Sequence, residues 1–438
     1  MSPAALGSPS TALPMPSSAS VPSADAAGAL PPPLKAGSAG HRSAKWALFV
    51  GGYATFAMFY GPQPLLSLFG VAFKLTPAQA SGVLSTAAAA MAIGLIPAGM
   101  LAQRLGPKPV MVGSIVLGAL ACLLCSVAPN YPTLLALRAL VGLVLAGLPA
   151  VGAAYLAEEM EARALGQAVG LIIAGNAAGG MSARLVCGAL ADGVSWRVAF
   201  AGLGALGAIA AFEFWRSLPV SRRHRVRPLD ARVVASDLRS VFRERGLVPL
   251  FGIGLLLMGA FVGFYNDLGF RLGLPPFSLS HGMIGAIFLL YVVGMFASPW
   301  AGRKADRLGS ATMLGWMLAA QIVGLGLTAF DRLPLIVLGV ALYTASFFAA
   351  HSIATAWVAR IAKQSKSLAS ATYLTAYYLG ASVMGWLCGH AWSAGGWPGV
   401  MGFLAMLWLA CVAIAWRLRR QPGSRPTALP VPSGTIGI

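Results

Sequence analysis

The chain has 438 residues, of which 58% are hydrophobic and only 10% are charged. Because soluble globular proteins carry roughly 25% charged residues, this composition excludes an ordinary soluble domain and indicates a membrane protein. The formal net charge is +19, but the basic residues lie in short segments between apolar stretches. We therefore expect no nucleic-acid partner.

The two ends of the chain differ from the rest. Residues 1–43 are rich in Ala, Pro and Ser and contain few bulky apolar side chains, so they cannot bury enough surface to offset the entropy of ordering. We predict a disordered N-terminal tail over 1–43 and, by the same reasoning, a disordered C-terminal tail over 419–438. The first segment also lacks the basic and apolar regions of a cleaved signal peptide.

Twelve apolar stretches between the tails are long enough to cross a bilayer, which takes about 20 residues in a helix. Each must pair its own backbone groups in the hydrocarbon core, so each is predicted to be a helix. In chain order, spans 1 to 12 cover residues 46–70, 78–102, 109–128, 133–156, 165–191, 196–218, 247–272, 281–301, 310–330, 333–358, 367–393 and 396–416. The fold class is therefore an all-α membrane protein.

The distribution of positive charge predicts the orientation. With both termini placed inside, 25 of the 31 Lys and Arg residues lie in inside segments, as the positive-inside rule requires. We expect a multi-pass protein of the bacterial inner membrane with both termini in the cytoplasm. The most basic segment, Arg222–Arg227 in the linker, is expected to contact anionic lipid.

A phrase in the sequence occurs twice. Gly99–Lys108 and Gly302–Ala311 share the pattern Gly-x-x-Ala-x-Arg-Leu-Gly at an offset of 203 residues, and each follows the second span of its half. Val186-Cys187-Gly188 and Leu387-Cys388-Gly389 correspond at an offset of 201. The repeats predict two pseudo-symmetric six-helix bundles, over 44–218 and 247–418, joined by a basic cytoplasmic linker over 219–246. Duplicated bundles of this kind form alternating-access transporters.

Several motifs carry a resemblance to a known family. The repeated phrase resembles the signature of the loop between the second and third spans in the major facilitator superfamily. Arg138-x-x-x-Gly142 resembles its second signature, and the segment from Gly175 to Gly180 resembles its antiporter signature. Over residues 45–418 the chain is similar to the 12-span drug:proton antiporters. Within them it resembles the YnfM-type inner-membrane exporters through the segments Ala150–Glu159, Gly175–Ser182, Phe347–Ser352 and Tyr377–Gly380.

The resemblance implies a cytoplasmic gate built from the two phrases. In the family, the acidic residue of the phrase is thought to meet a helix N-terminus in the opposite half, where the dipole favours negative charge. Asp306 fits that role in the second copy, whereas the first copy has Gln103. Glu158 and Glu159 are candidate partners for the hinge cations. The gating residues are Gly99, Gln103, Arg104, Gly106, Lys108, Gly302, Asp306, Arg307 and Gly309, with Glu158 and Glu159.

The antiporter-like motif consists of Gly175, Asn176, Gly179 and Gly180. Its glycines allow neighbouring helices to approach closely. Asn176 stands where the family signature has proline, so we expect a smaller kink in span 5.

Four charged or titratable residues inside the spans are candidates for proton coupling or transport: Arg138, Arg184, His351 and Asp267. Such residues are costly in a bilayer and usually serve a function. Each has a structural alternative. The arginines can reach toward the outer interface, and His351 can be a neutral histidine bonded to a hydroxyl. Arg271 follows Asp267 by one helical turn, and we favour a local ion pair between them.

Aromatic and amide side chains form the candidate substrate cavity, because small-molecule sites combine apolar walls with a few polar groups. The candidates are Tyr60, Gln63, Tyr265, Asn266, Tyr373 and Tyr377. Each of them singly is also explained by packing.

The favoured function is proton-coupled efflux of small organic molecules, drug-like or sugar-like, by alternating access. The alternative is an uncoupled or proton-coupled facilitator for a neutral sugar or organic-acid metabolite, and a non-transporting receptor or scaffold is a third hypothesis. We expect no enzyme activity, because the sequence contains no phosphate-binding loop, metal-ligand cluster or triad outside the apolar spans. We accordingly expect no cofactor, metal or catalytic residue, and a monomer whose partners are the substrate, protons and lipid.

Overall fold

The computed structural model describes residues 31–224, 231–362 and 366–419, without the side chains of 162–167, 169, 231–234, 366 and 367. Residues 33 onward form one compact unit. The predictions for 1–30 and 420–438, and for lipid contact at 225–227, lie outside the described residues.

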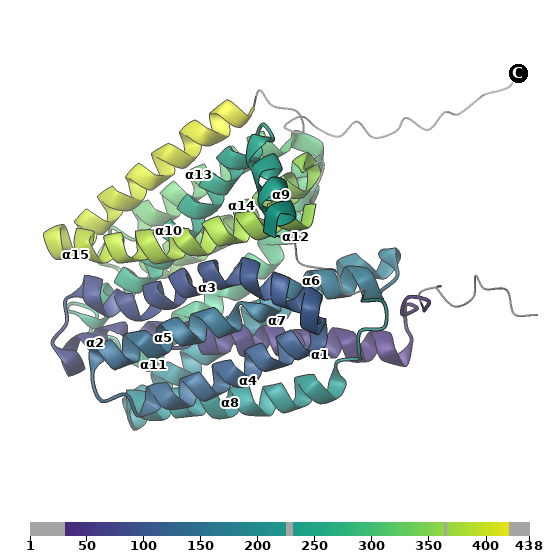
Figure 1. Cartoon of the computed structure of the whole chain (residues 1–438). Coiled ribbons are helices and arrows are strands. Elements are labelled where there is room, and N and C mark those ends of the chain that lie inside the picture. The colour runs from purple at the N-terminus through teal and green to yellow at the C-terminus, as the bar shows by residue number, and fades with distance from the viewer. Residues whose placement is uncertain (1–30, 225–230, 363–365, 420–438) are drawn as a thin grey trace, which may run out of the picture. The chain divides into compact units, whose positions relative to one another are not determined.

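The first half contains six membrane-spanning elements, shown in the lower part of Figure 1. Span 1 is α1 (Ala39–Tyr60), η2 (Gln63–Leu65) and α2 (Leu66–Phe73), span 2 is α3 (Pro77–Leu105), and span 3 is α4 (Pro107–Ser126). Span 4 is α5 (Tyr131–Leu145) with α6 (Gly147–Glu159), span 5 is α7 (Ala162–Gly193), and span 6 is α8 (Trp196–Ser217).

The second half repeats this order. Span 7 is α10 (Leu247–Gly273), span 8 is α11 (His281–Ile287), η3 (Phe288–Leu290) and α12 (Tyr291–Leu308), span 9 is α13 (Ser310–Leu327), and span 10 is α14 (Leu333–Ile361). Spans 11 and 12 share α15 (Lys366–Leu418), which is broken by non-helical backbone at Gly395 and Gly396. The predicted all-α fold with twelve spans is thus confirmed.

The boundary of the N-terminal tail was predicted wrongly. α1 begins at Ala39 because Ser38 accepts a hydrogen bond from the backbone N–H of His41 and so caps the helix. Before it, the backbone N–H of Leu34 donates to the carbonyl oxygen of Glu159 at 2.7 Å. Residues 33–43 are therefore ordered by contact with the end of span 4, which the composition of the segment does not reveal.

The linker contains a helix that was not predicted, α9 (Ala231–Arg243). Val241 is fully buried, and the ring of Phe242 lies 6.0 Å from that of Phe251 in α10. Apolar residues of an otherwise basic segment thereby hold α9 against the second half.

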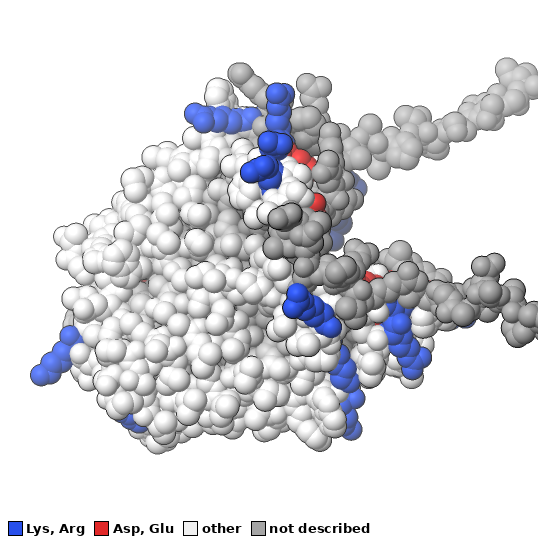
Figure 2. Space-filling model, viewed as in Figure 1, with Lys and Arg blue, Asp and Glu red and all other residues white. Residues whose placement is uncertain are grey.

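The two copies of the repeated phrase have the same backbone geometry. Gly106 has φ 89° and ψ 157°, and Gly309 has φ 88° and ψ 142°. Each glycine N–H donates over 2.9 Å to the carbonyl four residues earlier and so ends its helix. We call the end of the bundle that carries these two glycines the hinge end, and the opposite end the far end. Figure 2 shows that most of the visible Lys and Arg side chains lie toward the hinge end, on both halves.

Glycines of spans 5 and 11 bring pairs of helices into close contact. A Cβ atom at Gly179 would lie 2.0 Å from the carbonyl oxygen of Tyr53, and one at Gly380 would lie 1.9 Å from that of Leu255. The two positions differ by 201 residues and meet spans 1 and 7 in the same way. Only glycine permits this approach, so Gly179 of the antiporter-like motif and its counterpart Gly380 have the same packing role.

Candidate functional site

Arg138 is completely buried in span 4 and donates only to backbone carbonyls. Its Nε donates to Val83 over 3.1 Å, and its terminal nitrogens donate to Met58 over 3.0 Å and to Phe59 over 2.6 Å. The Met58 carbonyl needs this donor because Pro62, four residues later, has no N–H to continue the helix. Arg138 therefore joins spans 1, 2 and 4 where span 1 breaks, rather than reaching toward the interface.

The two halves meet at the far end through Asp192, the next-to-last residue of α7. Its carboxylate accepts hydrogen bonds from the backbone N–H groups of His281 (3.0 Å) and Gly282 (2.7 Å), and it lies 2.8 Å from the His281 ring. A Cβ atom at Gly188 would lie 2.3 Å from the His281 carbonyl oxygen. An acid of the first half thus caps the first helix of span 8, where the helix dipole favours negative charge.

A second connection between the halves lies deeper in the membrane. Arg184 of span 5 donates from Nε to Gln63 Oε1 over 2.8 Å, and Gln63 Nε2 donates to Asn266 Oδ1 over 2.8 Å. Gln63 and Asn266 are separated by 203 residues, the same offset as the repeated phrase. We call these three residues the amide clasp. It places equivalent amides of spans 1 and 7 against each other.

Aromatic rings from both halves surround the Arg184 guanidinium. Its central carbon lies 4.7 Å from the ring centre of Tyr60, 4.5 Å from that of Phe288 and 5.1 Å from that of Tyr291. Cation–π attraction of this kind contributes about 0.5–2 kcal/mol per contact. The rings therefore stabilise a buried positive charge that a carboxylate would stabilise in most proteins.

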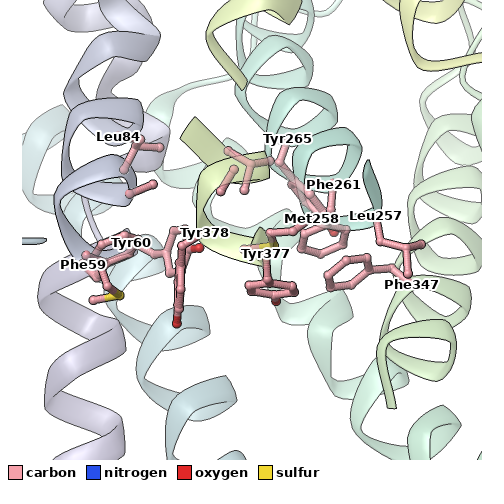
Figure 3. Packing of buried hydrophobic residues seen from close by; sticks show 14 of the residues in the cluster. Phe59, Tyr60, Leu84, Leu257, Met258, Phe261, Tyr265, Phe347, Tyr377 and Tyr378 are labelled. Atoms are coloured by element: carbon pink, nitrogen blue, oxygen red, sulfur yellow. The ribbon is translucent and has the colours of Figure 1, made fainter. Parts of the chain in front are cut away.

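The candidate cavity residues are all buried, and most belong to one aromatic cluster (Figure 3). Tyr378 lies 5.9 Å from Phe59 between ring centres, so the cluster crosses between the halves. Tyr377 lies beside Tyr378 at 5.3 Å, and Phe261 stacks on Phe347 at 3.7 Å. The structure thus brings the predicted aromatic side chains together.

His351 extends this cluster toward the hinge end. Its Nδ1 lies 3.0 Å from the hydroxyl of Tyr373, and its ring centre is 4.6 Å from that of Tyr377. This contact agrees with the alternative of a histidine bonded to a hydroxyl. The hydroxyl belongs to span 11.

The expected ion pair between Asp267 and Arg271 is wrong. Arg271 instead pairs with Asp331 at 3.0 Å and donates to the carbonyl of Thr328. The end of α13 leaves carbonyls without helical donors, and together with Asp331 they offer Arg271 more acceptors than one carboxylate does.

Asp267 is left as a fully buried acid in span 7. Its carboxyl oxygens accept no hydrogen bond of normal geometry from any described residue, and the thiol of Cys388, a weak donor, lies beside them. Burying an unpaired carboxylate is costly, so this position calls for an explanation beyond packing.

At the hinge end, the expected partners of the first phrase are also corrected. Glu159 Oε1 accepts from the Ser221 hydroxyl (2.8 Å) and from the backbone N–H groups of Arg222 (2.8 Å) and Arg223 (2.9 Å). It holds the start of the linker and does not pair with a hinge cation, because three neighbouring donors converge on one oxygen.

The other hinge residues of the first half also face the linker. Glu158 lies 3.9 Å from the ring of His224, and that ring lies 3.2 Å from the backbone carbonyl oxygen of Gln103. The Lys108 ammonium donates to the carbonyl of Leu218. Neither glutamate therefore contacts Lys108 or Arg104 among the described residues.

In the second phrase, Asp306 pairs with Arg360 of span 10 at 3.2 Å. Arg360 also donates to the hydroxyl of Ser310, which begins α13. The acid expected to meet a helix of the opposite half is therefore bound within its own half.

Three contributors to the contact between the halves were missed. Asp192, Phe288 and Tyr291 are not among the candidate residues of the sequence analysis. Gln63 and Asn266 differ by 203 residues, the offset of the repeated phrase. Residues related by the repeat can meet at the pseudo-symmetry axis, so this offset could have predicted their contact.

Comparison with known proteins identifies the family. The family model described as Major Facilitator Superfamily matches residues 48–279. The inner membrane transport protein YnfM of Escherichia coli is 40% identical over 375 residues, which cover 86% of this chain and 90% of YnfM. The chain belongs to the major facilitator superfamily. The uncharacterized facilitator-type transporter YybF of Bacillus subtilis is 37% identical, over 89% of this chain and 96% of YybF.

A solved structure supports the same fold. A D-xylose–proton symporter superimposes with a TM-score of 0.70 at 17% identity, over 89% of this facilitator and 99% of the symporter. At this identity the likeness establishes the fold alone. As a member of the superfamily the protein is a multi-pass membrane secondary transporter and not an enzyme, and its substrate is a small molecule.

Proposed function

We propose that this facilitator is a proton-coupled exporter of small organic molecules in the bacterial inner membrane, with the hinge end and both termini in the cytoplasm. The excess of Lys and Arg toward the hinge end supports this orientation (Figure 2). The antiporter-like motif, with Gly175 packed on span 1, and the resemblance to drug:proton antiporters support export. The two six-helix bundles are the moving units, and the active form is a monomer.

The contacts between the halves support an alternating-access cycle that starts from an inward-facing state. Asp192 and the amide clasp hold the far end closed. A Cβ atom at Gly389 would lie 2.6 Å from Ala78, so spans 2 and 11 are also in close contact at that end. Export then requires these contacts to separate while the hinge phrases close.

Asp267 is the proposed proton carrier, and its buried carboxyl without an ionic partner is the observation on which the coupling rests. A carboxyl exchanges a proton, whereas an arginine guanidinium stays charged in proteins. Asp267 also follows Asn266 of the amide clasp directly. Loading and releasing a proton there changes the charge of span 7 next to the contact between the halves.

The other candidates have different roles in this proposal. Arg138 is satisfied by three carbonyls and stabilises the break in span 1. His351 is bound to Tyr373 and contributes to the aromatic wall. Arg184 carries the fixed positive charge of the site.

Inverted membrane vesicles with an internal pH dye test the proposal. A panel of small organic compounds is added after a proton gradient is formed, and coupled export appears as dissipation of the gradient with uptake of a compound. We expect Asp267→Asn to abolish proton movement. Glu213→Gln, which removes an acid paired with Arg216 near the hinge end, is the matched control and is expected to retain it.

Two outcomes would contradict the proposal. Transport that continues unchanged without a gradient selects the uncoupled facilitator for a neutral sugar or organic-acid metabolite. Coupled transport that survives Asp267→Asn excludes Asp267 as the carrier.

A further inference from the structure

We propose that Arg184 and the donors around it bind the carboxylate of an organic monoanion, so that the transported molecules are apolar or aromatic carboxylic acids. This inference rests on the proposed transport function and specifies the substrate class of the same site. Four observations lead to it: the buried charge of Arg184 without an acid, unpaired polar groups, a glycine at the repeat-related position, and the aromatic rings around the guanidinium.

The first observation is the charge of Arg184, which is 2% exposed. Its two hydrogen bonds go to neutral acceptors, Gln63 Oε1 at 2.8 Å and the Gly180 carbonyl at 2.6 Å. No acidic side chain among the described residues forms an ion pair with it. A guanidinium has five N–H donors, so more than half of its donor capacity has no acceptor in the described part of the chain.

The second observation is that further buried polar groups where the two halves meet lack hydrogen-bond partners among the described residues. The hydroxyl of Tyr60, whose ring lies under the guanidinium, has no hydrogen-bond partner in the described part of the chain. Asn266 Nδ2 and the hydroxyl of Ser85 are also unpartnered. A buried polar group without a hydrogen-bond partner is destabilising, so the unpaired groups of Tyr60, Asn266 and Ser85 indicate that an acceptor is missing.

The third observation is that a glycine stands at the position related to Arg184 by the repeat. Gly385 of span 11 corresponds to Arg184 at the offset of 201 residues. A Cβ atom built there would lie 3.2 Å from Val262 Cγ1, 3.6 Å from Asn266 Nδ2 and 3.7 Å from Ser85 Oγ. The second half therefore carries no side chain where the first half carries Arg184, and two unused polar groups border that position.

The chemistry of these groups selects the ligand. Asn266 Nδ2 and the guanidinium only donate, which excludes cations and favours an anionic acceptor. A planar carboxylate matches the fork of a guanidinium, and a single buried cation compensates a single negative charge. Tyr60, Phe288 and Tyr291 border the guanidinium, and aromatic faces suit an apolar or aromatic body.

Equilibrium binding to the purified full-length protein tests the inference without any proton gradient. The protein is placed in nanodiscs of phosphatidylcholine, so that no anionic lipid competes. The probes are matched acid and amide pairs, namely benzoate and benzamide, cinnamate and cinnamamide, and octanoate and octanamide. We expect at least one carboxylate to bind about tenfold or more tightly than its amide, because hydrogen bonds to charged groups are the stronger kind.

Variants test whether Arg184 causes the preference for a carboxylate over its amide. Arg184→Gln is expected to abolish it, and Arg184→Lys to weaken it, because lysine keeps the charge but not the planar fork. Arg197→Gln is the matched control. Arg197 is an arginine at the far end that donates to the Ala128 carbonyl, and its loss is expected to leave the preference unchanged. If Arg184→Gln does not elute as a folded protein, Asn266→Asp replaces it, since it removes a donor and adds a repelling charge at nearly constant shape.

Equal binding of acid and amide in all three pairs by the unchanged protein would overturn the inference. So would a carboxylate preference that persists in Arg184→Gln. These results leave the proposed export intact if neutral compounds still move protons in vesicles, whereas failure of proton movement together with normal carboxylate binding refutes only the coupling.

Discussion

Arg138 and Pro62 illustrate how single residues solve the problem of a broken helix inside a membrane. Pro62 removes the N–H that would pair with the Met58 carbonyl, and no water is available in the hydrocarbon core to replace it. Arg138 supplies the donor from span 4 over 3.0 Å. The cost of burying the guanidinium is offset because it binds three carbonyls at once.

A double-mutant cycle tests this account. Arg138→Gln is expected to lower the free energy of unfolding by about 1.5–3 kcal/mol, the contribution of hydrogen bonds to a charged group. Pro62→Ala restores an N–H at a position whose backbone is already helical. In the double variant the new N–H pairs with Met58, so the combined loss should be smaller than the sum. Thermal and denaturant unfolding in detergent measure all four proteins, and strict additivity would contradict the shared carbonyl.

At the residue scale, the sequence singles out charged residues inside the spans but does not show what they contact. Arg138, Arg184 and Asp267 stand out because charges are rare in apolar spans. Their partners are mostly backbone carbonyls, aromatic faces or nothing, and such partners leave no pattern in the sequence. The spacing of Asp267 and Arg271 correctly predicts that they are near each other on one helix, but it cannot show that the end of α13 offers better acceptors.

At the scale of elements, each copy of the repeated phrase contains one glycine that ends a helix and one that lies inside a helix. Gly106 and Gly309 end their helices with φ near 90°, a region of backbone space that is almost restricted to glycine. Gly99 and Gly302 lie inside α3 and α12, and a Cβ atom at either would meet nothing within 4 Å. The sequence shows that the phrase is duplicated. It does not show which glycine of the phrase ends a helix and which lies inside one.

Alanine substitutions separate these duties. Gly106→Ala and Gly309→Ala are each expected to destabilise the protein by about 1–3 kcal/mol, because alanine strains the positive-φ turn. Gly99→Ala and Gly302→Ala in the same phrases serve as controls. We expect these to be neutral or stabilising by up to about 1 kcal/mol, since alanine favours the helix interior. Melting temperatures of the four variants give the comparison, and equal effects at all four positions would refute the turn requirement.

For the whole molecule, the repeat predicts the architecture but not the conformational state. Twelve spans, two halves and the matching hinges follow from hydropathy and self-similarity. The far end is held by contacts between the halves, such as Asp192 with the start of span 8, and in the proposed cycle these contacts separate when that end opens. Two states of one sequence differ by a few kcal/mol, so pattern alone does not select between them.

Residues at opposite ends of the molecule are therefore expected to shift the same equilibrium, between a closed and an open far end. Asp192→Ala removes the cap on α11 and is expected to favour opening of the far end by about 1–2 kcal/mol, or roughly 5–30-fold. Gln103→Asp adds the acid that the first hinge phrase lacks, which should strengthen closure of the hinge end and thereby also favour opening of the far end. The two sites are far apart, so their effects should add.

Cysteine labelling measures this shift. Ser85→Cys, in a background without the native cysteines, places a thiol of nearly the same size beside Gly385 where the halves are in contact. A membrane-impermeant maleimide applied from the far side should label it faster in either variant than in the parent. Asp331→Asn is the control, because Asp331 pairs with Arg271 within the second half. An unchanged rate in Asp192→Ala would show that this cap does not hold the far end closed, and an unchanged rate in Gln103→Asp would remove the hinge phrase from the gating residues.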